Sequence, residues 1–218
     1  MPKPKFVYWR AASRAQNAML MFHTASKEYD WDSETANKWP ETKSVMPFGQ
    51  LPVFYDSDNN LIAQSNAITR YCAKICGLMP NMPLECAKVD MIIEQTNDIF
   101  NLMAKCKYAG DEKAVVNAWK EFNEKKMHDK LLPLNGMLQD NYYGGNTPNA
   151  GDVCVFSVIN LIVKAGIKEC LVTYPKLYDH YKRMIEHGTI KEYLISNVPV
   201  YFVYKDKVDT KVSSSVSN

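Results

Sequence analysis

Features typical of disulfide-bonded, metal-binding and redox-active proteins are scarce in this sequence. Its six cysteines, at positions 72, 76, 86, 106, 154 and 170, form no Cys-x-x-Cys pair and have no metal-ligand spacing with the four histidines. We therefore expect reduced cysteines and no metal site. Cys72 and Cys76 lie four residues apart, on one face of an expected helix, which favours packing over redox chemistry.

Signals for nucleic acids, membranes and secretion are also missing. The net charge of the 218 residues is only +2 and no basic run is present, so nucleic acid is not an expected partner. No apolar run reaches the ~20 residues that span a bilayer. The N-terminal Met-Pro-Lys-Pro-Lys leads into strand-like residues rather than the apolar core of a signal peptide. We expect a cytoplasmic protein without a membrane partner.

The chain mixes strand and helix patterns in its first third and is helical afterwards. The stretch Gly77–Pro83 cannot form a continuous helix and separates the two compositions. We expect a small α/β domain over 1–77, an all-helical domain over 84–207 and a loose serine-rich tail over 208–218. The first domain should contain a strand at Lys5–Trp9, a helix at Arg14–Lys27, an irregular segment with a short strand at Trp31–Val45, a hairpin of Val53–Tyr55 and Leu61–Ala63, and a helix capped by Ser65.

The helical part contains one segment that is apolar on nearly every side, Asp152–Lys164, which predicts a helix surrounded by protein. Asn149 precedes it and Asp152 follows three residues later, so the two can form a capping box with Asp in place of the usual Glu. Further helices are expected at Glu85–Lys107, at Asp111–Gln139 with a break near Pro133, at Pro175–His187 and at Thr189–Ser196, followed by an aromatic return at Tyr201–Tyr204.

The stretch from Met46 to Ala73 is the most informative part of the chain. Its hairpin delivers Gln64 and Ser65 to a helix N-terminus, where free backbone N–H groups and the helix dipole favour a carboxylate or phosphate. If the bond before Pro52 were cis, the backbone of Leu51 would be free to pair with a ligand. From this stretch alone, an ordinary edge hairpin with a helix cap is the simpler interpretation.

Several short motifs in a fixed order carry a family resemblance. They are Phe6-Val7-Tyr8-Trp9 with Arg14-Ala15, Trp39 with Lys43, Phe48-Gly49-Gln50-Leu51-Pro52-Val53, Gln64-Ser65-Asn66-Ala67-Ile68, Val89-Asp90 with Asp98, and the segment from Asn149 to Asp152. With these motifs the chain resembles the cytosolic glutathione transferases to about Lys207, and most closely the sigma class, which includes glutathione-dependent prostaglandin D synthases.

The resemblance implies a thioredoxin-like N-terminal domain with a cis bond at Pro52, followed by an all-helical C-terminal domain. Glutathione, the co-substrate, would lie along Leu51 and pair with its backbone. Gln64 and Ser65 would bind the γ-glutamyl end of glutathione. The glycyl end would be held by Trp39, Lys43 and Gln50, and Arg14 would support the site from the first helix.

The resemblance also assigns the chemistry to Tyr8. A free thiol has a pKa of roughly 8.5, so little thiolate exists at neutral pH. A phenol that donates a hydrogen bond to the sulfur favours the anion, and lowering the thiol pKa by ~2 units corresponds to ~2.7 kcal/mol. Ser13 is the alternative, because some transferase classes use a serine in this loop, although capping of the first helix is its simpler role.

The sequence departs from the family pattern in three places. The glycine usual before the first-helix arginine is absent from Arg10-Ala11-Ala12-Ser13, a change that we expect to alter the catalytic loop. The acidic residue that commonly follows the Arg-Ala pair is Gln16, and the helix cap is Asn149 rather than Ser or Thr.

The resemblance leaves the second substrate and the exact activity open. A small hydrophobic electrophile would sit near Met103, Lys107 and Tyr108, with Ile159 and Tyr204 as possible walls. A glutathione-dependent isomerase and a non-catalytic, crystallin-like relative are the alternatives to conjugation and detoxification. The resemblance further implies a homodimer in which Asp98 reaches the glutathione of the other subunit and Phe48 inserts into the partner.

Overall fold

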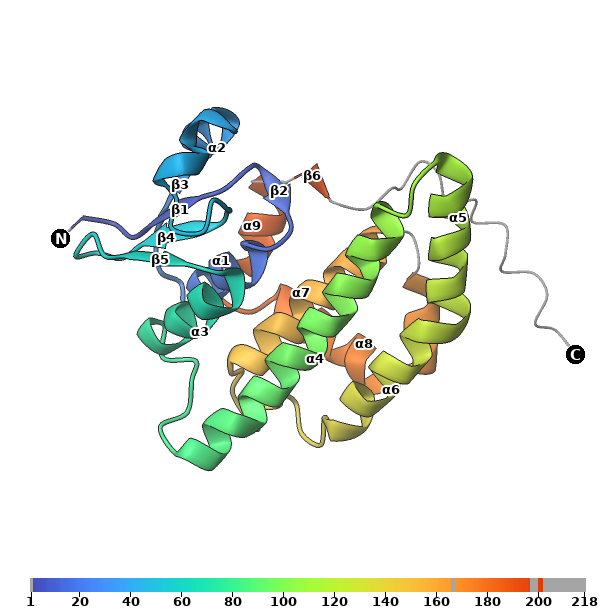
Figure 1. The fold of residues 1–218 in the computed structure, drawn as a ribbon. Coiled ribbons are helices and arrows are strands. Elements are labelled where there is room, and N and C mark those ends of the chain that lie inside the picture. The colour runs from blue at the N-terminus through green and yellow to red at the C-terminus, as the bar shows by residue number, and fades with distance from the viewer. Residues whose placement is uncertain (1, 166–167, 197–199, 202–218) are drawn as a thin grey trace, which may run out of the picture.

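The computed structural model describes residues 2–165, 168–196 and 200–201 (Figure 1). A small α/β part comes first and a helical part follows, which confirms the expected fold class. The α/β part consists of β1 (Lys5–Val7), β2 (Ala11–Ala12), α1 (Gln16–Thr24), β3 (Asp30–Asp32), α2 (Glu34–Asn37), η1 (Glu41–Val45), β4 (Val53–Tyr55), β5 (Leu61–Ala63) and α3 (Ser65–Ile75).

The helical part begins at Pro83, where a proline at the first helical position starts a 25-residue helix. Its elements are α4 (Pro83–Lys107), α5 (Glu112–Glu121), the π-helical turn η2 (Phe122–Lys126), α6 (Met127–Met137), α7 (Ala150–Lys164), η3 (Lys168–Thr173), α8 (Pro175–Ile185) and α9 (Ile190–Ser196). A last strand, β6 (Val200–Tyr201), pairs in parallel with β2. Of the expected aromatic return at Tyr201–Tyr204, residues 202–204 lie outside the described part.

The central sheet has the strand order β3-β1-β4-β5, with β1 parallel to β3 and antiparallel to β4. Alternation along the strands separates its two faces. Phe6 and Phe54 belong to the large core that includes residues of α1 and α3, whereas Val7 and Val53 pack with Ala36 of α2 and with the loop after η1. The sheet therefore holds the β1–α1 loop and the β4–β5 hairpin in fixed positions.

Helix α7 is the most buried helix, as its all-round apolar sequence predicts, and it lies between α4, α8 and α1 (Figure 1). Its capping box is confirmed. The Asn149 side chain accepts hydrogen bonds from the N–H groups of Gly151 and Asp152, and the Asp152 carboxylate accepts one from the Asn149 N–H at 2.9 Å.

The predicted break at Pro133 is wrong, because α6 continues through this residue. Leu131 and Leu134 are almost fully buried on either side of Pro133, and their packing outweighs the single backbone donor that proline lacks. The interruption lies earlier, at the π-helical turn Phe122–Lys126, whose first residue is fully buried.

Disulfides, metal sites and membrane-spanning helices can each be examined in the described residues. Cys72, Cys76, Cys86, Cys106 and Cys154 are free thiols. No group of three or more His, Cys, Asp or Glu residues in the described part has a metal-binding arrangement. Among the helices formed by these residues, none combines the length and apolar character needed to cross a bilayer.

Candidate active site

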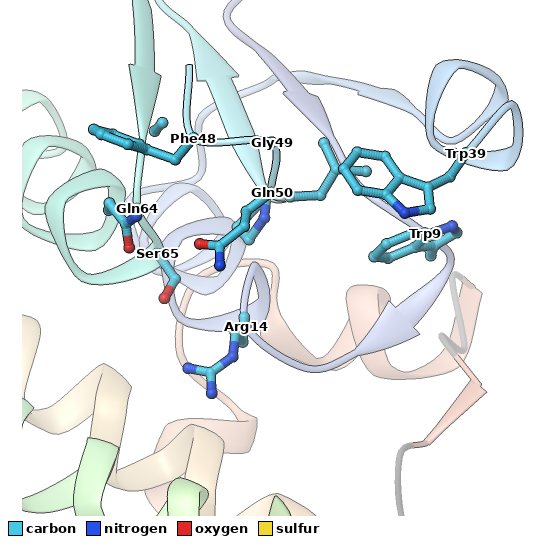
Figure 2. Close-up of a pocket in the computed structure, with 11 residues that line it drawn as sticks. Trp9, Arg14, Trp39, Phe48, Gly49, Gln50, Gln64 and Ser65 are labelled. Carbon is cyan, nitrogen blue, oxygen red and sulfur yellow. The ribbon is translucent and has the colours of Figure 1, made fainter. Parts of the chain in front are cut away.

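A cleft of about 490 Å³ lies where the β1–α1 loop, the segment before β4 and the N-terminus of α3 meet (Figure 2). It brings together seven of the ten residues that the sequence assigns to glutathione binding. These seven are Arg14, Trp39, Gln50, Leu51, Pro52, Gln64 and Ser65. They come from four segments of the chain, so the α/β fold assembles the site.

Leu51 presents unpaired peptide groups to this cleft. The Leu51–Pro52 peptide bond is cis, as the resemblance implies, and Trp39–Pro40 is a second cis bond that the sequence did not predict. Pro52 leads directly into β4, whose Val53 pairs with Ala63 of β5. In the described part of the chain, neither the N–H nor the C=O of Leu51 makes a hydrogen bond. An extended peptide ligand can therefore pair with them in the manner of an added strand.

The helix start at Ser65 differs from the prediction. Gln64 occupies the N-cap position and Ser65 is the first helical residue, so the predicted Ser65 cap is wrong. No side chain caps this end, and the N–H groups of the first turn have no partner in the helix itself. Gln64 has φ of 71°, a conformation that side-chain-bearing residues rarely adopt and that costs about 1–3 kcal/mol. The resulting corner can bind an anion.

Tyr8 lies just beyond β1 and is buried, with 5% of its surface exposed. Burial raises the pKa of its phenol, although the Ser13 side chain, the Arg14 backbone and the charge of Arg14 oppose this effect. Tyr8 therefore keeps its proton at neutral pH and is available as a donor. Its backbone is held by Trp31, whose indole nitrogen donates to the Tyr8 carbonyl at 3.0 Å.

Ser13 does not cap the first helix, which corrects the simpler role assigned to it. Helix α1 begins at Gln16 with Ala15 at the N-cap position and without a side-chain cap. The chain forms a three-residue (i to i+3) turn before the helix, in which the Gln16 N–H donates to the Ser13 carbonyl at 2.9 Å. The buried Ser13 side chain instead lies near the Tyr8 phenol, where it opposes the rise of the pKa of that phenol, so the two candidate residues are neighbours.

Arg14 lies at the edge of the cleft with its guanidinium directed toward the helical part (Figure 2). Its Nη2 donates to Asn101 Oδ1 at 3.1 Å, and its guanidinium carbon lies 5.1 Å from the centre of the Phe100 ring. Both partners belong to α4, so this helix sets the position of Arg14 relative to Tyr8.

The other three predicted residues do not line the cleft. Tyr8 lies beside it, and Lys43 is exposed on η1, with its side chain against Gly49. Asp98 lies on α4, where its carboxylate forms a salt bridge with Lys130 at 2.9 Å. The geometry of this one chain therefore gives Asp98 no direct contact with the cleft.

The suggested electrophile residues differ in their accessibility. Met103 and Ile159 have 1% and 0% of their surface exposed, so they are core residues. Lys107 is half-buried and Tyr108 is 72% exposed at the end of α4, where the phenol acts electrostatically on Tyr8. Tyr204 lies outside the described residues.

Four residues line the cleft without having been assigned to glutathione: Trp9, Phe48, Gly49 and Ala63. Trp9 packs edge to face against Trp39, with ring centres 5.9 Å apart, and so positions a predicted ligand contact. Trp9, Phe48 and Gly49 belong to the same motifs as Tyr8 and Leu51, so their closeness to these residues in the sequence could have placed them at the site. Nothing in the sequence distinguishes Ala63.

Comparisons with known proteins match both parts of the chain. The N-terminal domain model of glutathione S-transferase matches residues 5–74, and the C-terminal domain model matches residues 97–197. The rat haematopoietic prostaglandin D synthase complexed with a quinoline superposes with a TM-score of 0.77, covering 88% of this chain and 96% of that one. Its sequence identity of 22% makes this a similarity of fold.

Two relatives match over most of their length. The chain is 28% identical over 203 residues to a probable glutathione S-transferase, gst-36, of Caenorhabditis elegans, covering 89% of this chain and 96% of the relative. It is 30% identical over 182 residues to the haematopoietic prostaglandin D synthase of Gallus gallus, covering 81% of this chain and 87% of that relative. With both domain models and these relatives, the chain belongs to the glutathione S-transferase family.

Proposed function

We propose that this protein is a glutathione transferase, which activates the thiol of glutathione as a thiolate and conjugates it to small hydrophobic electrophiles. The observation that carries the proposal is the cleft itself. It combines the unpaired peptide groups of Leu51 with the uncapped N-terminus of α3, and Tyr8 lies beside it. A peptide with a carboxylate at one end and a thiol in its middle matches these three features.

In this proposal the tripeptide lies along the cleft in an extended form. Its cysteinyl backbone pairs with the N–H and C=O of Leu51. The γ-glutamyl carboxylate meets the N–H groups at the start of α3, with Gln64 and Ser65 beside it. Trp39, Lys43 and Gln50 hold the glycyl end, and Lys43 reaches its carboxylate from η1 as a charge-assisted partner.

Tyr8 donates a hydrogen bond to the sulfur and so favours the thiolate, which is the nucleophile, while the thiol proton passes to solvent. Burial keeps the phenol protonated, and the nearby Ser13 side chain stabilises the charge on its oxygen. Arg14, held by Asn101, adds a positive charge on the same side. With an aryl halide, the thiolate attacks the ring carbon, the carbon–halogen bond breaks and halide leaves with the bonding electrons, and the conjugate departs with its sulfur bonded to that carbon.

Paired Tyr8→Phe and Ser13→Ala variants test this mechanism. Tyr8→Phe should still bind immobilised glutathione but lose about 2.7 kcal/mol of thiolate stabilisation, measured as a thiol pKa that is ~2 units higher in the pH–rate profile with an aryl halide. Ser13→Ala should show a smaller rise of the same pKa, because it removes only the support of the phenol. An inactive Ser13→Ala with an active Tyr8→Phe would reverse the roles.

A second candidate function is a glutathione-dependent isomerase of the prostaglandin D synthase type. The observation that favours it is the 30% identity to the Gallus gallus prostaglandin D synthase over 87% of that relative. The same thiolate would open and close a ring without being consumed. Turnover of prostaglandin H2 without formation of a conjugate would establish this activity, whereas glutathione binding with neither activity would indicate a crystallin-like relative.

The active unit in this proposal is a homodimer with shared sites. Asp98 stays more than half exposed beside its salt-bridge partner Lys130 and lies on α4 outside the cleft of its own chain, so its carboxylate can also meet the α-amino group of glutathione bound by the other subunit. Phe48 lines the cleft and is 64% exposed, which suits an aromatic anchor for the partner.

The remaining assignments rest on the resemblance of the motifs. We place the protein in the sigma class, with a role in detoxification and a cytoplasmic location. We divide it into a glutathione-binding domain over 1–77, a helical domain over 84–207 and a tail over 208–218. The stretch between α3 and α4 supports the position of the linker, because it contains no helix or strand.

A further inference from the structure

The segment between Tyr8 and Arg14 contains a strand that the sequence did not predict. Ala11–Ala12 form β2, which pairs in parallel with β6 in the register Ala11 to Val200 and Ala12 to Tyr201 (Figure 1). The glycine that is usual in the family is missing from this same segment. The catalytic loop is therefore held by a strand from the other end of the described chain.

Two alanines suit this strand better than glycine would. Ala12 is fully buried, and residues 9–14, which all lie in the described part, have no positive φ. The segment therefore does not need the left-handed conformation for which glycine is the usual choice. Glycine would instead weaken the strand, because it loses more conformational freedom when it is ordered. The departure from the family pattern thus fits the pairing with β6.

Side chains from other elements hold the two ends of the segment. The Tyr8 carbonyl accepts a hydrogen bond from the Trp31 indole at 3.0 Å, and Arg14 Nη2 donates to Asn101 Oδ1 at 3.1 Å. The middle of the segment bonds locally, since the Ala11 N–H donates to the carbonyl two residues before it at 2.7 Å. The pairing with β6 connects this middle part to a distant segment of the chain.

Helix α9 determines where β6 lies. It ends at Ser196, shortly before Val200, and packs against α1. The N–H of Thr189, which directly precedes α9, donates to the His23 carbonyl of α1 at 3.0 Å, and Tyr193 of α9 is almost fully buried. Because β2 leads into α1 and β6 follows α9, the packing of these two helices brings the two strands together.

We propose that β6 is a positioning element of the candidate active site, whose backbone pairing with β2 holds Tyr8, Ser13 and Arg14 in the arrangement that activates the thiol. The inference rests on the proposed transferase function. Because β2 lies between Tyr8 and Ser13, a shift of this strand moves the Ser13 side chain and the Arg14 charge relative to the phenol. Leu51 and the N-terminus of α3 lie on other segments, so glutathione binding itself does not depend on β6.

The test changes the backbone of β6 in the full chain. Successive N–H groups of a strand point to opposite sides, so one of Val200 and Tyr201 directs its N–H toward β2. The double variant Val200→Pro/Tyr201→Pro removes that N–H whichever residue carries it. The matched control, Val200→Thr/Tyr201→Phe, keeps both N–H groups, the β-branched side chain and the aromatic ring.

The readout is the pKa of the thiol of bound glutathione, measured from the ultraviolet absorbance of the thiolate. The proline variant should raise this pKa by about one unit and lower kcat/KM with an aryl halide about tenfold below the thiol pKa, because the phenol is no longer held in place. Its affinity for S-hexylglutathione, which has no free thiol, should be unchanged, and the control should match the wild type. An unchanged thiol pKa in the proline variant, or an equal rise in the control, would overturn the proposal.

A second variant acts from the other strand. Ala12→Gly keeps the N–H but loosens β2, so it should raise the thiol pKa by less than the proline variant does. Thermal unfolding checks both variants, and Ala12→Gly decides the question if the proline variant does not fold; an unchanged thiol pKa in it would then refute the role of β6. A wild-type thiol pKa no lower than that of free glutathione would instead refute the transferase proposal, and this inference with it.

Discussion

The carboxylate of Asp152 connects more of the helical part than a helix cap requires. It is fully buried and accepts four hydrogen bonds, from the N–H groups of Tyr143, Gly144 and Asn149 at 2.8, 3.2 and 2.9 Å and from His180 Nε2 at 2.8 Å. The loop before α7, the start of α7 and the middle of α8 therefore meet at one side chain. Replacing Asp152 by alanine removes all four acceptor contacts at once.

The structure predicts different losses of stability for Asn149→Ala and Asp152→Ala, whereas the sequence motif predicts similar losses. From the capping box alone, Asn149→Ala and Asp152→Ala should each cost roughly 1 kcal/mol or more. One buried donor, His180, and three part-buried N–H groups lose their acceptor, which at about 1 kcal/mol each raises the expected cost of Asp152→Ala to as much as about 4 kcal/mol. Asn149→Ala loses only the cap and should stay near 1 kcal/mol. For a chain of this length, 4 kcal/mol corresponds to a Tm lower by roughly 8–16 °C.

Urea denaturation followed by far-UV circular dichroism measures the free energy of unfolding of both variants. Asp152→Asn is the matched control, because it keeps the shape and one acceptor oxygen and should fall between the wild type and Asp152→Ala. Activity per folded molecule should change little in all three. If Asp152→Ala cost no more than Asn149→Ala, the shared carboxylate would not contribute as the geometry implies.

Three further predictions concern Asp98, Gln64 and His23. If the proposed homodimer shares its sites, Asp98→Ala should weaken glutathione binding, whereas Lys130→Ala, which removes only the salt-bridge partner of Asp98, should not. Equal effects in a calorimetric titration would limit Asp98 to that salt bridge. Gln64→Gly should raise the free energy of unfolding by about 1 kcal/mol, because glycine adopts a φ of 71° without strain, yet it should no longer be retained on immobilised glutathione. Gln64→Ala should also lose retention but should not become more stable. A rise in stability in both variants would disprove backbone strain at this position. Burial lowers the pKa of His23 from 6.5 to about 4, so as the pH falls the imidazole takes up a proton in the unfolded chain before it does so in the folded one. Up to about 3 kcal/mol of the free energy of unfolding should therefore be lost between pH 6.5 and pH 4. His23→Gln should flatten this part of a plot of urea midpoint against pH, and an unchanged slope would contradict a neutral His23.

Local signals predicted the elements whose cause is local. The hairpin has the predicted bounds, Val53–Tyr55 and Leu61–Ala63, because a dense turn cluster separates two short apolar runs. The capping box is present because its donors and acceptors lie within four residues. The same reasoning failed at Ser65, where Gln64 adopts a backbone conformation that its residue type does not indicate.

Contacts between distant segments could not be read from the sequence in this way. Ser13 was interpreted as a local cap, but no side chain caps α1, and Ser13 lies near the phenol of Tyr8. The side chains of His23 and Thr189 form a hydrogen bond of 2.8 Å although they are 166 positions apart. No periodicity or spacing encodes such pairs, because they depend on how α1 and α9 pack.

The departure at Gln16 also has a physical explanation in the packing of the two parts. Its side chain is almost fully buried at the start of α1, and its amide nitrogen donates to the Ser157 hydroxyl of α7 at 3.2 Å. A neutral amide avoids the cost of burying a charge at this position. Together with the hydrogen bond from Arg14 to Asn101 of α4, this contact fixes both ends of the segment that follows Ser13 to the helical part. Helices that do not line the cleft therefore determine where the groups around Tyr8 lie, so substitutions in α4 or α7 should alter the thiol pKa without contacting glutathione.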